Sequence, residues 1–485
     1  MLLGPAGDVR AQASASYRVD YPHDVWAEQD PALWQAAIAQ VVARLRADAG
    51  VEATDIGAIG FACQVDGVVA VDDGARPLRP AILWMDRRAA LEAELVRTRI
   101  DPDEVRAISG LNLDAYHCGP KIAWIRANEP EVAARASAYL VPGSFLVEWL
   151  TGERLVDHAN ASSTMLYDVS TRTWSARLFA AFELDASRAN ELLGRVADAT
   201  EVAGTLTAAA AEQLGLSTAC RVVVGSGDEH GAALGAGVVR PGTICDITGT
   251  AEPVGVAALS PLIDPSGLLE THAHADPRAW FIENPGFVSG GSVRWFLDIV
   301  GGDEARMSAE AAAIGPGSAG VSFLPALAGS TTPRWDAHAR GAFTGLSLGH
   351  GRAHLARAVL EGCTFGLRDL VDRLTELGLG GDEIRVVGGG ARSATWLQMK
   401  ADVTGRVVRV LAAPEATAMG AGYLAGTAVG IFADLDEAIE RCTIFDPTTY
   451  EPEPSVRAAY DDAYGRYRSV FDALSPLELG RGGER

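Results

Sequence analysis

The sequence predicts an α/β protein built of two domains. Short apolar runs that fit buried strands alternate with longer segments whose apolar residues recur at helical spacing. The chain has 485 residues, enough for two or three domains with their own cores, and its sequence pattern changes after Val239. We therefore place one domain at residues 1–239 and a second at residues 240–485. Each half can be read as a β-hairpin and further strands, followed by helices that cross back over a sheet.

The first half contains strand and helix signals in alternation. DIGAIGFA (55–62) predicts a buried strand that ends at Cys63–Gln64, and residues 81–99 begin extended and become helical. Prolines mark the starts or breaks of several helical segments. The expected helices cover residues 31–49, the later part of 81–99, 119–136 with a break at Pro130, and a segment that ends at Gly152.

The stretch VVVGSGDEHGAALGAGVV (222–239) joins a valine run to an acidic pair and a histidine. The valines predict a short buried strand, and GSG predicts the turn that ends it. Small residues at helical spacing in GAALGAGVV then predict a helix that packs closely against a neighbour. An aspartate at the end of a buried strand, beside a cleft, can accept a proton from a hydroxyl group.

The second half shows three glycine turns that are joined to strands or helices. Residues 242–258 predict two strands joined by a Gly249–Thr250 turn, residues 286–302 a glycine turn that opens a helix, and residues 383–405 a strand, a triple-glycine turn and a helix. Residues 354–378 predict the longest amphipathic helix. Glycine turns let backbone N–H groups face a ligand, so these turns favour a nucleotide site over ordinary tight turns. Neither a P-loop nor a strand-to-helix GxGxxG is present, which disfavours an NAD site.

Composition and charge exclude several classes of partner. The net charge of −22 argues against a nucleic-acid backbone or an anionic membrane as the main partner. We find no apolar run near the ~18 residues that a membrane span needs, and the first ten residues do not read as a secretory signal. Six scattered cysteines without a CxxC pair predict buried free thiols in a cytoplasmic protein.

The histidines do not predict a metal site. THAHAD places His272 and His274 on one face of a strand, but a third ligand at useful spacing is missing. Mg²⁺ is expected to arrive with ATP, held mostly by phosphate oxygens and water.

Two interpretations of Asp228 and Glu229 remain open from position alone. Asp228 could be a catalytic base, or a turn residue that caps a helix beginning near His230. Glu229 could bind a substrate hydroxyl or favour the helix N-terminus. Similarly, Asp86 and Arg87 could be ligands or a structural ion pair.

Several blocks resemble the FGGY carbohydrate kinases, the group that contains xylulokinase and glycerol kinase, and together they cover nearly the whole chain. GAFTGLSLGHGRAHLARAVLE (341–361) fits the second signature of that family. GSGDEHGAALGAGVVRPGT (225–243) looks like its catalytic-aspartate segment, and VVGGGARSATWLQMKADVTG (386–405) like its adenosine loop. FLPALAGSTTPRWD (323–336) is similar to another family block. YHCGPKIAWIRAN (116–128) resembles the first signature less well, because Cys118 and Ala127 depart from it.

The resemblance implies two actin-like (ribonuclease H-like) domains that close on a cleft, and ATP-dependent, Mg²⁺-assisted phosphorylation of a sugar or polyol hydroxyl. A ketopentose such as xylulose is the expected substrate, and a homodimer is possible. Asp228 matches the general base. The positions that match sugar-facing and nucleotide-facing residues of the family are Asp66, Trp84, Tyr116 and Glu229 for the sugar, and Thr250, Gly290, Arg294, Gly389, Gly390 and Ser393 for the nucleotide. Trp84 and Tyr116 could instead be core or cleft-wall residues.

Two departures from the family pattern bear on substrate and activity. Asp66 stands where xylulokinases carry a histidine, and its Gln-x-Asp-Gly context is closer to erythritol-type polyol kinases. The opening Asp-x-Gly-Thr turn of the family, which contacts phosphate and Mg²⁺, is lacking, so residues 1–19 read as the second strand, turn and third strand of that hairpin. We expect an upstream start more than a loss of activity. The rival functions are a catalytically impaired sugar or nucleotide sensor on the same fold, and an actin-like or Hsp70-like ATPase.

Overall fold

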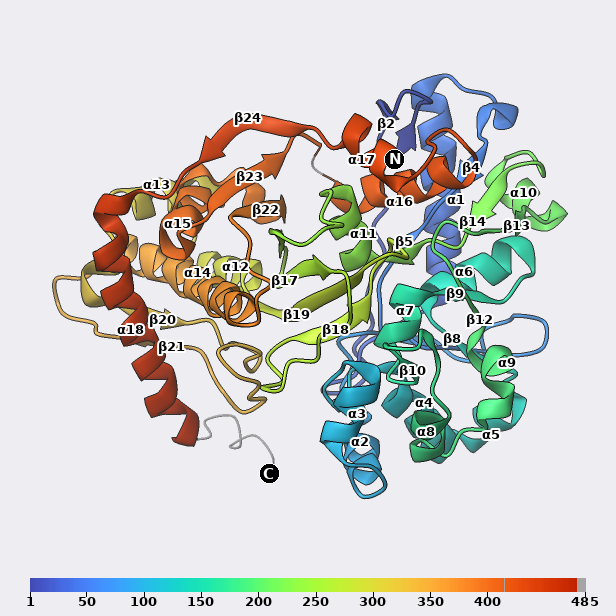
Figure 1. The fold of residues 1–485 in the computed structure, drawn as a ribbon, viewed down its shortest axis with the longest axis horizontal. Coiled ribbons are helices and arrows are strands. Elements are labelled where there is room, and N and C mark those ends of the chain that lie inside the picture. The colour runs from blue at the N-terminus through green and yellow to red at the C-terminus, as the bar shows by residue number, and fades with distance from the viewer. Residues whose placement is uncertain (414, 478–485) are drawn as a thin grey trace.

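The computed structural model describes residues 1–413 and 415–477. The C-terminal GRGGER, for which the sequence predicts a frayed tail, lies outside the described residues. Two lobes face each other, with the N-terminal half on one side and most of the C-terminal half on the other (Figure 1). None of the described helices is both long enough and apolar enough to cross a membrane. Of the six cysteines, none forms a disulfide and all but Cys63 are buried, as predicted.

The C-terminal lobe is organised around a seven-stranded sheet with the order β18-β19-β17-β16-β22-β23-β24. β16 pairs in parallel with β22, and β22 with β23, while the other neighbours are antiparallel. A small hairpin, β20-β21, lies apart from this sheet. The strands are β16 (Thr243–Thr248), β17 (Ala251–Ala258), β18 (Glu270–Ala273), β19 (Trp280–Val288), β20 (Ser322–Leu324), β21 (Ala342–Thr344), β22 (Glu383–Gly388), β23 (Val407–Leu411) and β24 (Phe445–Tyr450).

Helices cover this sheet, and the longest of them forms part of the core of the lobe. The predicted long helix is α14, which runs from Arg352 to Glu376 and is the longest in the structure. Its residues 356–371 are buried on every side, so it is a core helix and the prediction of a one-sided amphipathic helix is wrong. The helices of this half are α12 (Gly290–Val300), α13 (Glu304–Ala312), α14, α15 (Ala394–Thr404), α16 (Ala416–Ala428), α17 (Leu435–Cys442) and α18 (Arg457–Leu474).

The N-terminal lobe is built from many short elements. Apolar periodicity predicted α1 correctly, which begins after the Asp30 cap and ends at Gly50 in a left-handed conformation. The expected break at Pro130 and the helix end at Gly152 are also confirmed. The helices are α1 (Pro31–Ala49), α2 (Ala90–Arg97), α3 (Pro102–Ser109), α4 (Cys118–Asn128), α5 (Pro130–Arg135), α6 (Pro142–Thr151), α7 (His158–Ser163), α8 (Ala176–Ala181), α9 (Ala189–Leu193), α10 (Ala208–Leu214) and α11 (Asp228–Gly235).

The strands of this lobe pair mostly two by two. The predicted strand 55–62 is divided into β4 (Ala58–Ile59) and β5 (Ala62–Cys63), and Gly60 between them lies against the backbone of α16. The pairs are β1 (Leu2–Leu3) with β2 (Val9–Ala11), β3 (Glu28–Gln29) with β7 (Ala81–Ile82), β6 (Val69–Val71) with β8 (Ala138–Leu140), β9 (Leu155–Asp157) with β12 (Arg195–Ala197), β10 (Tyr167–Asp168) with β11 (Thr173–Trp174), β5 (Ala62–Cys63) with β15 (Ser226–Gly227), and the trio β13 (Val202–Thr205), β14 (Arg221–Val223) and β4 (Ala58–Ile59).

One edge of β4 and β5 has no strand beside it among the described residues. β4 is the outer strand of β13-β14-β4, and β5 pairs with β15 alone. In the C-terminal lobe the central strand β22 lies between two neighbours, β16 and β23. The β1-β2 hairpin forms as the sequence predicts.

Helices α11 and α16 pack face to face through glycines and join the two halves of the chain. A Cβ atom on Gly235 would lie 1.9 Å from the carbonyl oxygen of Ala416, and one on Gly420 would lie 2.0 Å from that of Gly231. Only glycine permits this approach of two backbones. The small residues of GAALGAGVV therefore serve helix packing, as predicted, and α16 and α17 lie beside the N-terminal lobe (Figure 1).

Candidate active site between the lobes

Asp228 lies where a buried strand gives way to a helix. β15 ends at Gly227, and α11 begins at Asp228. The alternative, in which Asp228 caps a helix that begins near His230, required a helix start two residues later. Gly227 is the cap residue, and the Asp228 carboxylate accepts a hydrogen bond from the backbone N–H of Glu229 at 3.0 Å. Asp228 is half-buried, not on an outer surface. Its side chain is therefore available for a role other than capping.

The surroundings of Asp228 strengthen its affinity for a proton. Burial, and to a smaller degree the negative charge of Asp66, raise the pKa of Asp228 to about 6. Burial and the charges of Asp228 and Asp66 raise the pKa of Glu229 well above its ordinary value. With a pKa of about 6, the Asp228 carboxylate is still mostly ionised at neutral pH, and it accepts a proton more readily than a solvated aspartate.

A single lysine holds three of the predicted sugar-facing residues in place. Lys121 on α4 is fully buried, and its Nζ donates to the backbone carbonyls of Asp66 (2.6 Å), Tyr116 and Trp84 (3.4 Å). Burial lowers the pKa of Lys121 to about 8. Asp66 adopts a left-handed backbone conformation with φ +56°, which is uncommon for a residue with a side chain and clusters at functional sites.

The two aromatic residues have different surroundings. Trp84 is 43% exposed, so the interpretation of Trp84 as a core residue is wrong. The Tyr116 hydroxyl donates to Glu270 Oε2 at 2.7 Å, and its ring stacks on Trp335 with centroids 6.3 Å apart. Tyr116 thus forms part of a wall to which both lobes contribute.

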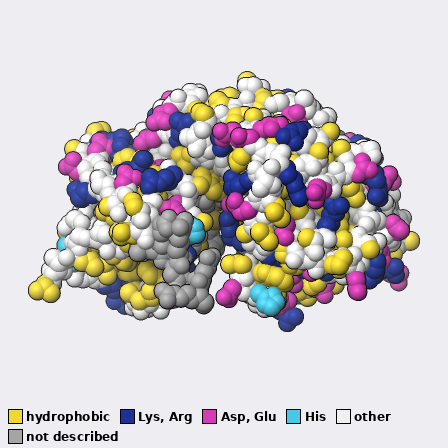
Figure 2. All heavy atoms as spheres, turned by 90° about the horizontal axis from the view of Figure 1, so that it is seen from below, with side chains coloured by type: hydrophobic (Ala, Val, Ile, Leu, Met, Phe, Trp, Pro, Cys, Tyr) yellow, Lys and Arg dark blue, Asp and Glu magenta, His cyan; other side chains and the backbone are white. Residues whose placement is uncertain are grey.

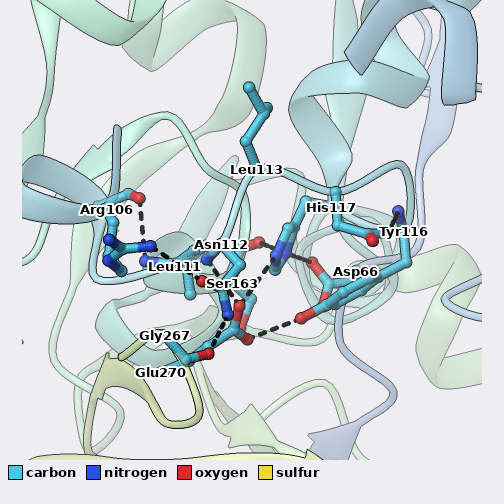
Figure 3. A network of polar contacts seen from close by, with 12 residues as sticks. Asp66, Arg106, Leu111, Asn112, Leu113, Tyr116, His117, Ser163, Gly267 and Glu270 are labelled. Carbon is cyan, nitrogen blue, oxygen red and sulfur yellow. Dashed lines mark hydrogen bonds and ion pairs between the residues drawn. The ribbon is translucent and has the colours of Figure 1, made fainter. Parts of the chain in front are cut away.

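His117 and Glu270 form a buried link between the lobes that sequence reasoning missed (Figure 3). His117 Nδ1 lies 3.2 Å from Asp66 Oδ1 and 3.0 Å from the carbonyl oxygen of Ser163, and its Nε2 lies 3.8 Å from Glu270 Oε1. The backbone N–H of Asn112 donates to the same Glu270 oxygen at 2.8 Å. Burial alone would lower the pKa of His117, but Asp66 and Glu270 outweigh it and raise the pKa to about 10.

This charged histidine predicts a pH-dependent stability. Since the pKa is about 10 in the folded chain and near ~6.5 when unfolded, its stabilisation is complete below pH ~6.5 and is lost as the pH rises through 10. We expect the difference in unfolding free energy between wild type and His117→Gln to shrink by up to ~1.4 kcal/mol per pH unit across this window. Urea denaturation at pH 7 and pH 10 measures it, and a constant difference would contradict a charged His117.

The loop that carries Trp84 is fixed by an ion pair that differs from the expected one. Asp86 is fully buried and accepts from the backbone N–H of Ala27 at 2.6 Å, and it pairs with Arg88 at 2.7 Å. Arg87 instead pairs with Asp114 at 2.8 Å. Arg88 is the residue whose side chain turns inward, so the suggested Asp86–Arg87 pair is wrong.

Two of the glycine turns meet at the end of the C-terminal sheet. Gly249 and Thr250 form the tip of the β16-β17 hairpin, as predicted. The backbone N–H of Gly290, at the start of α12, donates to the carbonyl of Gly249 at 3.0 Å, and that of Gly291 donates to Thr250 at 3.0 Å. A Cβ atom on Gly290 would lie 2.3 Å from the Gly249 oxygen, so glycine is required there.

The third turn joins the same edge through the parallel pair of β16 and β22, in which Thr248 faces Gly388. A Cβ atom on Gly390 would lie 2.4 Å from Thr248 Cγ2, so packing demands that glycine. At Gly389 a Cβ atom would find its nearest neighbour at 3.9 Å, and the residue is exposed. Packing within the chain therefore does not explain Gly389, and its exposed position leaves room for a ligand to approach the backbone.

The remaining two positions that the family resemblance assigns to the nucleotide are Ser393 and Arg294. Ser393 caps α15 by accepting from the backbone N–H of Trp396, and its hydroxyl lies 2.9 Å from that of Ser308. Arg294 is exposed on α12, one turn after Gly290. The exposed Thr250 hydroxyl and the exposed Arg294 guanidinium are donors that suit a triphosphate, with Mg²⁺ held by its oxygens and by water.

A furrow separates the lobes in the view from below, where acidic and basic side chains are interspersed over both (Figure 2). A cavity of about 600 Å³ has walls from both halves, including Arg106 and Asn112 on one side and Trp335 and Arg373 on the other. None of the sequence-predicted site residues lines it. Because Trp335 stacks on Tyr116, the cavity adjoins the predicted sugar site and does not coincide with it.

Comparisons with known proteins fit this arrangement. Residues 1–235 match the N-terminal domain of the FGGY family of carbohydrate kinases, and residues 246–429 match its C-terminal domain. A xylulose kinase of Escherichia coli is 30% identical over 98% of this chain and 97% of its own length, and a glycerol kinase of Aromatoleum aromaticum is 33% identical over 90% and 89%.

Solved structures show the same fold. The xylulose kinase of Rhodospirillum rubrum has a TM-score of 0.85 at 30% identity, with 95% of this chain and 93% of that chain covered. The ligand-bound xylulose kinase of Lactobacillus acidophilus has a TM-score of 0.89 at 23% identity, over 97% and 95%. The predicted fold class, two actin-like (ribonuclease H-like) domains, is confirmed. The chain belongs to the FGGY family of carbohydrate kinases.

Proposed function

We propose that this chain transfers the terminal phosphoryl group of ATP to a hydroxyl group of a ketopentose, with xylulose as the first candidate. ATP-dependent phosphorylation of a sugar, with Mg²⁺, is the reaction of its family. The observation that carries the proposal for this site is the Lys121 cluster, which ties Asp66, Trp84 and Tyr116 together beside Asp228 and its strand. The names of the relatives supply xylulose as the candidate.

In this proposal Asp228 accepts the proton of the attacking hydroxyl as the phosphoryl group is transferred. The reaction depends mainly on positioning and on stabilisation of phosphate charge. Thr250, Arg294 and the backbone N–H groups at Gly389 and Gly390 hold the phosphates and the nucleotide, and Gly290 allows the close approach of the two turns. Closure of the two lobes excludes water and limits wasteful ATP hydrolysis.

The acidic residues at the sugar site set the substrate class. Asp66 and Glu229 are acceptors when ionised, so they bind hydroxyl groups of the substrate. His117 already pairs with Asp66, which fixes the orientation of that carboxylate. An acceptor pair also suits a small polyol, and Asp66 is the observation that favours an erythritol-type kinase as the second candidate.

A substrate panel tests the proposal directly. ADP release is measured with xylulose, ribulose, erythritol and glycerol, and with no sugar, at saturating Mg²⁺–ATP. We expect the highest kcat/KM with xylulose. A preference for erythritol selects the second candidate, and ATP hydrolysis that no sugar increases supports the ATPase rival. Binding of sugar and ATP without turnover supports the sensor.

The nucleotide loops predict a selective effect of Thr250→Val. The change removes one hydroxyl donor but keeps the shape of the side chain. We expect KM for ATP to rise by about 3–10-fold, the equivalent of one neutral hydrogen bond, while KM for the sugar stays the same. Thr173→Val, at an exposed threonine in the N-terminal lobe, is the control. Equal changes in both KM values would argue against a phosphate contact.

Dimer formation and a cytoplasmic location remain predictions. Light scattering after size-exclusion chromatography measures the first, and a mass of one chain would contradict it.

A further inference from the structure

Three side chains from three separate elements converge at a buried point next to the catalytic segment. His230 belongs to α11, His272 to β18 and Glu283 to β19, and each offers one ligand atom within 4.8 Å of the others. His272 Nε2 lies 3.6 Å from Glu283 Oε1, and the rings of His230 and His272 meet edge to face with centroids 5.4 Å apart. All three residues are buried, with 0%, 4% and 1% exposure.

Several polar atoms of this cluster lack hydrogen-bond partners, whereas His272 Nδ1 lies 3.4 Å from Ser163 Oγ. Both ring nitrogens of His230 have no hydrogen-bond partner among the described residues, and neither oxygen of Glu283 forms a hydrogen bond of normal geometry, although its carboxyl group lies beside that of Glu229. Leaving such groups unsatisfied inside a protein is costly. A Cβ atom on residue 227 would come within 2.8 Å of His230 Nδ1, so Gly227 keeps that nitrogen uncovered. The cluster therefore has the features of a site that a bound species completes.

The charge of the surroundings indicates what that species is. The carboxylates of Glu229 and Asp228 act electrostatically on Glu283, as does Glu270, two residues before His272. Negative charge gathered in a buried region is balanced most directly by a cation. Two imidazoles and one carboxylate are ligands that zinc and similar divalent transition metals prefer over Mg²⁺.

We propose that His230, His272 and Glu283 bind a divalent transition-metal ion of the zinc type. The ion is distinct from the Mg²⁺ that accompanies ATP, because its ligands lie away from the glycine turns. It joins α11, which begins at Asp228, to two strands of the C-terminal sheet, so it would fix the start of that helix across the two lobes. In the sequence, His272 and His274 share one face of a strand. The fold supplies His230 and Glu283 instead, and His274 bonds to Val238.

The test uses the full chain without sugar or ATP, so that its outcome is independent of the proposed function. Protein purified without a histidine tag is stripped with a chelator, and Co²⁺ and Zn²⁺ are added separately in excess Mg²⁺. We expect one equivalent of Zn²⁺ by mass spectrometry of the metal content, and a visible d–d absorption band with Co²⁺. His230→Asn and Glu283→Gln should each weaken binding at least as much as the ~10–100-fold loss caused by removing an outer-shell partner.

Two other variants separate this site from surface adsorption. His350 and His354 have ring centroids 5.0 Å apart and could hold a metal on their own. His354→Asn and the exposed His23→Asn should therefore retain the equivalent bound by wild type. Circular dichroism of the stripped variants checks folding, and if His230→Asn does not fold, Glu283→Gln decides. Absence of stoichiometric metal, unchanged affinity in Glu283→Gln, or loss of the ion in His354→Asn overturns the proposal.

Discussion

Asp228→Asn is expected to lower kcat for sugar phosphorylation at least ~100-fold, because the amide cannot accept the hydroxyl proton. The side chain keeps its shape and its hydrogen bond from the N–H of Glu229, so KM for the sugar and for ATP should change little. A loss confined to kcat indicates an interaction made in the transition state. Steady-state kinetics by ADP release measure both parameters.

The control for Asp228→Asn is Asp24→Asn, at an exposed aspartate of the N-terminal lobe, which should keep full activity. Glu229→Gln gives a second comparison, since a residue that binds a substrate hydroxyl should mainly raise the sugar KM. Full activity in Asp228→Asn would remove it as the base. Loss of activity with loss of the thermal transition would point to a structural role.

Lys400→Met is expected to destabilise the chain by about 3–5 kcal/mol, the usual cost of removing one partner from a buried ion pair. Lys400 on α15 is fully buried, and its Nζ lies 2.5 Å from Asp246 Oδ2 and 2.9 Å from Glu252 Oε1. It also donates to Thr248 Oγ1 at 2.6 Å, in the strand that leads to the Gly249–Thr250 turn. The methionine leaves two carboxylates buried without a cation. Urea denaturation at pH 7 measures the loss.

Two comparisons make the Lys400 result specific. Adding Asp246→Asn and Glu252→Gln to Lys400→Met removes the stranded charges and should recover much of the stability. Lys121→Met tests the other lysine, which contacts carbonyl groups instead of carboxylates, so its loss should fall more on sugar binding than on stability. Equal stability losses in the single and triple variants would contradict an electrostatic origin.

The elements that sequence reasoning located well are those set by local signals. The Asp30 cap and Gly50 define α1, and valines followed by glycine define the strand before Asp228. The glycine turns were found for the same reason, since their backbone requirements are visible in the chain. The interior of α14 was misjudged because its sequence carries Arg357 and Glu361, which pair with each other inside the core at 2.7 Å.

Contacts between distant segments could not be predicted from the pattern. His117 and Glu270 are more than 150 positions apart and meet only because the two lobes close on each other. Lys121 lies in the block 116–128 that resembles the first signature, but its role depends on three carbonyl groups that only the fold brings together. For His117, the one sequence signal of a role in the site was its position directly after Tyr116, which matches a sugar-facing residue of the family.

Lys121 and Lys400 are the only lysines of the sequence, and both are completely enclosed. The folded chain thus presents its positive charge to solvent almost entirely as guanidinium. Reagents that acylate amines, and enzymes that modify lysine side chains, cannot reach either lysine side chain until the structure opens. Acylation of Lys121 or Lys400 would therefore report the opening of one lobe or the other.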